Sequence, residues 1–434
     1  MKNFWEKMST ALKDPMLRKR IGFTIAALVV FRALAAIPIP GVDSANLANY
    51  LSSNQLLGFI NIFSGGGLSN LSIVMLGVGP FITASIVIQL LTMIFPKWKA
   101  LLHDEGELGR RKLSHYSRLL SVPLALISAV GFLTLLQSQP GILPALTTSS
   151  FIMNVIIVAA GSTLLMWIGE LISEFGIGNG VSLIIFGGIV STLPATVLQN
   201  VARLQTTGGA DLPFYILALA IALLAVAGVV YVTEAERSVP VTYAKQVRGN
   251  KVYGGASTYL PLRLNQSGVI PIIFALSILI FPQIIFAGVA KMTAYPVLAS
   301  WAQSFALFFA PGTWVYGILY FIMVIAFTYF YTAVTFDPKM ISENLQKSGA
   351  FIPGVRPGDH TRDHLANIVT RITLVGALFL GFVAVLPLII QAFSPTGASG
   401  NSGIAIGGTA LLIVVSVVLD LLKKIDAQIA MREY

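Results

Sequence analysis

The sequence predicts an all-α polytopic membrane protein with ten transmembrane helices, and three observations support this fold class. Hydrophobic residues make up 56% of the 434 residues and charged residues only 11%, against roughly 25% charged in an ordinary soluble domain. Ten apolar stretches are long enough to cross a bilayer, and the basic residues lie almost entirely on one side of them. A soluble protein of this size could not hide so much apolar surface from water, which excludes a soluble enzyme, a disordered chain and a fibrous repeat.

The predicted spans follow from the length of the apolar runs. Crossing about 30 Å of hydrocarbon takes around 20 mostly apolar residues in a helix. Continuous runs of this length also exclude an outer-membrane barrel, whose strands alternate with period two. The spans lie at about 21–38, 71–95, 119–137, 151–171, 181–200, 213–233, 268–290, 311–332, 368–390 and 405–422.

The positions of the basic residues predict the orientation. Of the 28 lysines and arginines, 25 precede the first span, follow the last one, or lie in every second loop between spans. The exceptions are Arg203 and Lys291 on the other side and Arg32 within the first span. The positive-inside rule therefore places both termini in the cytoplasm. The N-terminus is not expected to be a cleavable signal, because the apolar run after Arg20 is long and lacks a small-residue cleavage site.

No catalytic residue, metal site or cofactor is predicted. The chain has no cysteine, no Walker A sequence and no HExxH motif, and its four histidines fall in cytoplasmic loops. His360 and His364 have i,i+4 spacing, but a solvated loop explains them better than a metal site. A secondary transporter for a small solute and an intramembrane enzyme remain alternatives. Both need polar or ionisable residues in mid-membrane, and the spans hold almost none.

Three segments outside the regular spans suggest function. The cytoplasmic loops 234–267 and 333–367 each exceed 30 residues and mix arginine and lysine with aromatic residues, glycine and proline. Although orientation explains most of the basic charge, such loops suit an acidic partner, either ribosomal RNA or an acidic motor protein. Residues 61–80 are semi-apolar and rich in glycine and serine. They fit a re-entrant segment that acts as a movable stopper, with a plain loop as the alternative.

Several motifs together identify a family. In their order and spacing they resemble the SecY family, the channel-forming subunits of the bacterial protein-conducting translocon, over nearly the whole chain. They are Ile37–Gly41, Phe63–Gly66, Ser85–Leu91, Glu105–Lys112, Gly176–Gly180, Gly268–Pro271 and Lys347–Gly358.

The resemblance implies an hourglass channel built from two pseudo-symmetric five-helix halves, about 1–205 and 206–434. At its waist a ring of apolar side chains would resist ion leakage, because it offers ions no hydration, and would fit around a passing polypeptide. Without the resemblance, each isoleucine would be taken as lipid-facing or as helix packing. The implied pore ring is Ile82, Ile86, Ile185, Ile189, Ile273 and Ile413.

The resemblance also implies a plug, a lateral gate and a docking platform. The gate lies between the second and third spans and the seventh and eighth, with Gln89 and Phe281 as lining residues, although packing is the simpler role for Phe281. Arg248, Lys251 and Arg356 would dock the motor or the ribosome, and Lys251 stands where a second arginine is commoner in the family. The implied plug consists of Asn61, Ile62, Phe63, Ser64, Gly65, Gly66, Gly67, Leu68, Ser69 and Asn70.

The implied function is passive conduction of unfolded polypeptides across the bacterial plasma membrane, with release of hydrophobic segments into lipid. The implied partners are the small membrane subunits SecE and SecG, the SecA motor ATPase, the ribosome, signal sequences and membrane lipid. Energy would come from the motor or from the translating ribosome.

Overall fold

The computed structural model describes most of the chain. The described residues are 14–40, 61, 64–68, 70–95, 97–98, 101, 106–137, 147–206, 212–243, 246–248, 251–253, 257–266, 268, 270–292, 296–309, 313–392 and 402–430.

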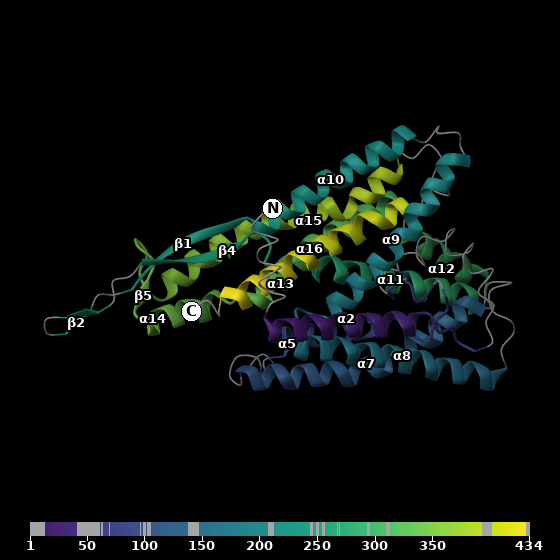
Figure 1. Cartoon of the computed structure of the whole chain (residues 1–434), viewed down its shortest axis with the longest axis horizontal. Coiled ribbons are helices and arrows are strands. Elements are labelled where there is room, and N and C mark those ends of the chain that lie inside the picture. Colours follow the sequence, from purple (N-terminus) through teal and green to yellow (C-terminus); the bar gives the residue numbers. More distant parts are fainter. Residues whose placement is uncertain are drawn as a thin grey trace. The chain divides into compact units, whose positions relative to one another are not determined.

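The described part of the chain is dominated by helices (Figure 1). Each of the ten predicted spans overlaps one helix, which confirms the predicted fold class. The helices are α2 (Pro15–Ala35), α5 (Gly79–Ile94), α7 (Gly106–Gln137), α8 (Thr148–Phe175), α9 (Gly180–Thr206), α10 (Leu212–Glu234), α11 (Ile270–Met292), α12 (Pro296–Phe308), α13 (Trp314–Thr335), α14 (Pro338–Lys347), α15 (Asp359–Ala392) and α16 (Ser402–Ala430).

Length and composition alone qualify six helical stretches among the described residues to cross a membrane. They are Leu108–Thr134, Thr148–Phe175, Gly180–Ala202, Leu212–Glu234, Trp314–Lys347 and Asp359–Ile390. Three shorter apolar helical stretches accompany them: Gly79–Thr92, Ile270–Leu279 and Val297–Phe308.

The second span and the segment after the seventh differ from the prediction. Residues 71–78 form turns, so the helix of the second span begins only at Gly79. Pro80 is compatible with this start, because the first turn of a helix needs no backbone donor at that position. The unpredicted helix α12 packs on α11 through stacked Phe286 and Phe305, whose ring centroids are 5.4 Å apart. At 13 residues it is too short for the span criterion used on the sequence.

The chain packs into two compact units. The first comprises Met1–Ala222, Ser277–Tyr316 and Pro387–Tyr434, and the second comprises Leu223–Leu276 and Gly317–Leu386. These units reflect packing, whereas the predicted halves 1–205 and 206–434 reflect internal symmetry. The division into halves therefore stays a prediction.

The first unit is built on helix packing of α7 against α5 and α8, of α8 against α2 and α9, and of α9 against α16. Its main buried cluster joins side chains from α7 and α8 to side chains of the turn segment before α5. The cluster members are Ile39, Leu68, Leu71, Met75, Leu76, Ala129, Phe132, Leu133, Leu136, Val155 and Val158.

The second unit contains the two long loops, and the structure joins them in one sheet. Strand β1 (Glu236–Tyr243) pairs antiparallel with β4 (Ser257–Arg263) along its length, from Glu236 opposite Arg263 to Thr242 opposite Ser257. On its other side β1 pairs with β5 (Ala350–Phe351) of the second loop. Between β1 and β4, strands β2 (Gln246–Arg248) and β3 (Lys251–Tyr253) form a separate hairpin.

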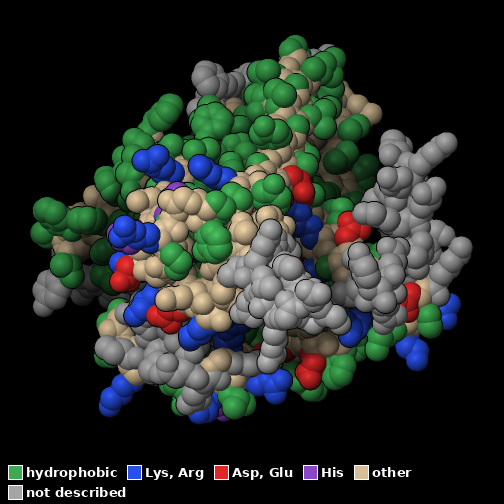
Figure 2. All heavy atoms as spheres, turned by 90° about the vertical axis from the view of Figure 1, so that its left-hand side faces the viewer, with side chains coloured by type: hydrophobic (Ala, Val, Ile, Leu, Met, Phe, Trp, Pro, Cys, Tyr) green, Lys and Arg blue, Asp and Glu red, His purple; other side chains and the backbone are tan. Residues whose placement is uncertain are grey.

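The outer surface agrees with a lipid environment. On the face in Figure 2, hydrophobic side chains cover broad areas, and lysine and arginine side chains gather in the remainder. Large apolar side chains stand exposed along the helices, including Leu224 on α10 at 71% and Trp314 on α13 at 78%. Contiguous exposed apolar surface of this kind marks contact with membrane or with a partner protein.

Candidate functional site

The six predicted ring isoleucines are all buried, none being more than 8% exposed. Two i,i+4 pairs lie on α5 and α9, where each pair shares one face of its helix. Ile413 lies on α16, which packs against α9. Ile273 lies on α11 in the part that belongs to the second unit. Their burial argues against the lipid-facing alternative for these side chains and leaves helix packing as the competing role.

The predicted plug contains a tight buried turn. The backbone N–H of Gly66 donates to the carbonyl of Asn61 at 2.8 Å, and the N–H of Leu68 donates to Ser64 Oγ at 3.1 Å. Gly65 and Gly66 have φ of +67° and +80°, a backbone conformation that favours glycine. Ser64 to Leu68 are all buried, whereas Asn70 is exposed. The other predicted plug residues, Ile62, Phe63 and Ser69, lie outside the described residues.

The turn 64–67, which we call the plug tip, fits between α2 and α9. Gly65 touches the ring of Phe31 on α2 and the backbone of Gly188 on α9 so closely that neither glycine has room for a Cβ atom. Arg32 Nη1 donates to the carbonyl of Gly65 at 3.0 Å. A Cβ atom on Gly66 would lie 3.2 Å from Thr192 Cγ2. The plug tip therefore lies directly beside the stretch of α9 that carries Ile185 and Ile189.

The chain that follows the plug tip is anchored separately. Leu68 and Leu71 are fully buried in the α7–α8 cluster. The N–H of Ile39 donates to the carbonyl of Leu71 at 2.8 Å, and the N–H of Ile73 donates to the carbonyl of Ile37 at 3.0 Å. The backbone here is thus non-helical, and its apolar side chains Ile39, Leu68 and Leu71 are buried within the protein.

The two predicted gate residues lie on separate helices. Gln89 on α5 is half-buried, and its Oε1 is buried without a hydrogen-bond partner among the described residues. A buried polar atom of this kind costs about 1–3 kcal/mol when unsatisfied. Phe281 lies on α11, directly before Pro282. Its side chain is outside the described residues.

The predicted docking residues lie in the loops that form the sheet. Arg248 and Lys251 are paired across the β2–β3 hairpin, and their side chains are outside the described residues. Arg356 is exposed between β5 and α15, on a segment held by the Thr361 Oγ1 donation to the Arg356 carbonyl at 2.9 Å. Ser342 Oγ of α14 donates to the carbonyl of Gly358 at 2.6 Å. The ion pairs of this segment join the neighbouring Arg362 to Asp359 and Asp363.

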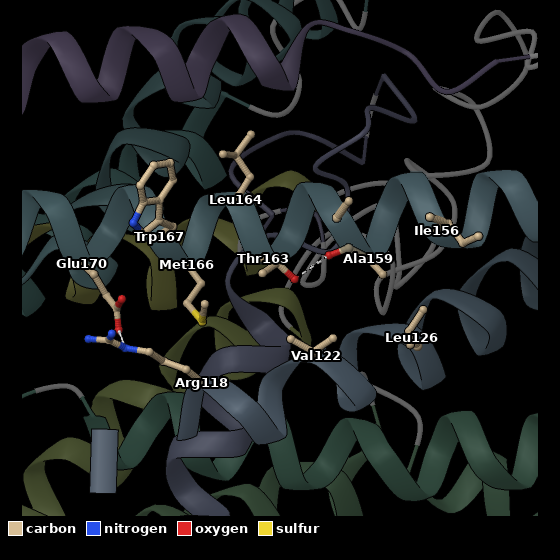
Figure 3. Close-up of a pocket in the computed structure, with 11 residues that line it drawn as sticks. Arg118, Val122, Leu126, Ile156, Ala159, Thr163, Leu164, Met166, Trp167 and Glu170 are labelled. Carbon is tan, nitrogen blue, oxygen red and sulfur yellow. Dashed lines mark hydrogen bonds and ion pairs between the residues drawn. The ribbon is translucent and has the colours of Figure 1, made fainter. Parts of the chain in front are cut away.

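A groove of about 610 Å³ between α7 and α8 was not predicted (Figure 3). Its wall is mostly apolar, including Leu126, Ile156 and Trp167, and an ion pair between Arg118 and Glu170 stands at one end. The pair joins the two helices across the groove. The available signal was that these two ionisable residues occupy the cytoplasmic ends of the third and fourth predicted spans. Among the described residues, no group of three or more potential ligands could hold a metal ion.

The fold and the buried residues define the class: an all-α polytopic membrane protein with a buried set of isoleucines and a buried glycine-rich turn. The family model described as SecY matches residues 72–422. The protein translocase subunit SecY of Thermus thermophilus is 43% identical over 441 residues, which cover 100% of this chain and 97% of that one. The chain belongs to the SecY family, which confirms the predicted family and the predicted role as a protein-translocation channel.

Solved structures share the fold. One, described as the structure of a protein conducting channel, has a TM-score of 0.64 at 20% identity and covers 96% of this chain and 94% of its own. Another, Sec61 in the canine ribosome–channel complex from the endoplasmic reticulum, has a TM-score of 0.61 at 18% identity. It covers 96% of this chain and 94% of its own.

Proposed function

We propose that this chain forms the central channel of a bacterial Sec translocase, passes unfolded polypeptides across the plasma membrane, and catalyses no bond-making. The observation that carries the proposal is the buried i,i+4 isoleucine pairs of α5 and α9, with the plug tip packed beside the pair on α9. A narrow ring of such side chains dewets, and ions do not pass because the constriction cannot replace their hydration shell. A charged or hydrogen-bonding ring would bind some sequences and trap them, whereas apolar side chains accommodate any sequence.

Lateral release of hydrophobic segments would use a gate that includes Gln89 and Phe281. A signal sequence with enough apolar residues gains free energy by partitioning into lipid, while polar chain stays in the pore. The unsatisfied oxygen of Gln89 supports this proposal, because a passing or intercalating peptide N–H group could satisfy it.

The two basic loops would form one docking platform for the SecA motor or the ribosome. The pairing of β1 with β5 supports treating them as one surface, since it holds the loop that carries Arg248 and Lys251 next to the loop that carries Arg356. An exposed arginine offers a charge-assisted, two-pronged contact to carboxylate or phosphate. The small subunits SecE and SecG would complete the complex. Both termini would lie in the cytoplasm, an orientation that the positive-inside rule supports.

The test is the planar-bilayer conductance of the purified chain with its small partner, comparing the intact protein with a deletion of residues 61–70. The intact channel should be closed at rest and the deletion should conduct, because the deletion removes the filler beside the ring. If neither form conducts, even with a signal peptide present, the channel proposal is wrong and a small-solute transporter becomes the better explanation.

A further inference from the structure

We infer that Arg32 is the latch that holds the plug tip in its resting seat, an inference that rests on the proposed channel function. Arg32 lies within the first predicted span, unlike the other two exceptions to the orientation rule, Arg203 and Lys291. Charged side chains within spans are costly and generally have a partner and a function. Here the partner is the backbone of the plug tip.

The geometry of the contact is specific. Nη1 of Arg32 donates to the carbonyl of Gly65 at 3.0 Å, and the same nitrogen lies 3.2 Å from the place where a Cβ atom of Gly66 would stand. Of the three plug-tip glycines, Gly65 and Gly66 have positive φ. A side chain at either position would therefore be strained and would push against the guanidinium or its neighbours. The two glycines bring the backbone close enough for the arginine to bind it directly.

Arg32 has a second favourable interaction at its position. It lies in the last turn of α2, where the carbonyl end of a helix attracts a cation. This interaction accounts for an arginine that stabilises the helix end, but it does not require a bond to a segment 33 residues further along the chain. The bond to Gly65 is the interaction that the latch accounts for.

The latch acts on the middle of the plug tip, at Gly65 and Gly66. From Leu68 onward the chain is secured by the α7–α8 cluster and by the backbone bonds of Ile37 and Ile39. Within the plug tip, Ser64 and Gly67 are bonded to this anchored chain, because the N–H of Leu68 donates to Ser64 Oγ at 3.1 Å and the N–H of Ser72 donates to the carbonyl of Gly67 at 2.8 Å. Arg32 instead binds the carbonyl of Gly65 in the middle of the turn. Loss of the arginine should therefore loosen the middle of the plug tip from α2 without unfolding the protein. This separation distinguishes a positioning residue from one that merely supports the fold.

The test is resting conductance of the complex in planar bilayers for Arg32→Met, Arg32→Lys and Arg18→Met, beside the 61–70 deletion. A hydrogen bond from a charged donor shifts an equilibrium roughly tenfold or more. Arg32→Met should therefore raise the resting open probability about tenfold. Arg32→Lys should restore much of the closure, because lysine keeps the charge and a donor. Arg18→Met is the matched control on the exposed start of α2 and should stay closed.

Each outcome separates the latch from the proposed function. If the deletion conducts and Arg32→Met stays as closed as Arg18→Met, the proposed role of Arg32 as a latch is wrong, but the proposed channel function is not affected. If neither the intact chain nor the deletion conducts, even with a signal peptide present, the channel proposal is wrong and the latch is wrong with it. If only a signal peptide opens the deletion, the channel proposal holds, and the latch is wrong because the plug tip does not close the channel.

Thiol accessibility gives a second readout that a purely structural role would not move. The chain has no cysteine, so single cysteines can be labelled cleanly. Ser64→Cys, in the plug tip, should be protected from a water-soluble maleimide in the parent and labelled about tenfold faster with Arg32→Met. Ser162→Cys is the control, because Ser162 is equally buried on α8 but bonds to Gly77 beyond the anchor. Equal acceleration at both sites would mean general loosening and would overturn the latch.

Discussion

Replacing Gly188 with alanine should raise the open probability of the resting channel, and the structure indicates the size of this increase. A Cβ atom at Gly188 would collide with Gly65 Cα and would lie 3.1 Å from the Gly65 carbonyl carbon and 3.2 Å from its nitrogen. These are backbone atoms, which cannot rotate away as the end of a side chain can. The plug tip must therefore shift, or leave its seat.

The size of the effect follows from overpacking energies. Inserting a methyl group into a closely packed site costs about 1–3 kcal/mol. Because the clash exists only while the plug tip is seated, this cost corresponds to a roughly 5- to 150-fold shift toward the open state. Alanine also favours a helix over glycine by about 1 kcal/mol, so α9 itself should not be weakened.

The neighbouring glycine supplies the matched control. A Cβ atom at Gly187 would lie 3.1 Å from Leu28 Cδ2, the end of a flexible side chain that can move aside. Resting conductance in planar bilayers should therefore rise for Gly188→Ala and stay at the parent level for Gly187→Ala. If the two variants have equal conductance while the 61–70 deletion conducts, then the close contact of Gly65 with Gly188 does not control closure, and the prediction is wrong.

The remaining predictions concern docking, the ring and the core. Arg356→Glu should abolish motor-dependent translocation into membrane vesicles while the protein still inserts, and unimpaired export would remove the docking assignment. Ile413→Asn or Ile273→Asn should raise ion leak and relax signal-sequence selectivity in an export assay, because a polar side chain rehydrates the constriction; unchanged leak and selectivity would contradict the ring. Leu133→Ala should cost about 2–5 kcal/mol and lower the melting temperature in detergent, since Leu133 is fully buried. Leu126→Ala, at a 39% exposed position on the same helix, should lower it much less.

The spans could be predicted because their cause is local. A helix that crosses hydrocarbon satisfies its own backbone hydrogen bonds, so an apolar run of sufficient length implies the helix. The same rule missed α12, which is too short to span, and extended the second span over residues 71–78. Those residues are apolar enough for a span, but Gly77 has positive φ and Leu71 adopts φ of +44°. Apolar composition alone cannot distinguish a buried turn from a helix.

Some features of the candidate site could be predicted from the sequence, and others could not. Motif resemblance selected six isoleucines, and all six are buried. Their burial could not be predicted from the sequence, because a helix that is apolar on every face does not indicate which face is buried. The contact of Arg32 with Gly65 and the union of the two loops through β1 and β5 had no sequence signal.

The sequence by itself determined the all-helical membrane fold, the family and the orientation expected from its charges, because hydrophobicity and charge act through the solvent and need no knowledge of partners within the chain. Only the tertiary structure decided where the plug tip sits, which glycines it needs and which charge holds it. Those features depend on contacts between segments distant in sequence, such as Gly65 with Gly188, and close packing selects them only once the helices have assembled.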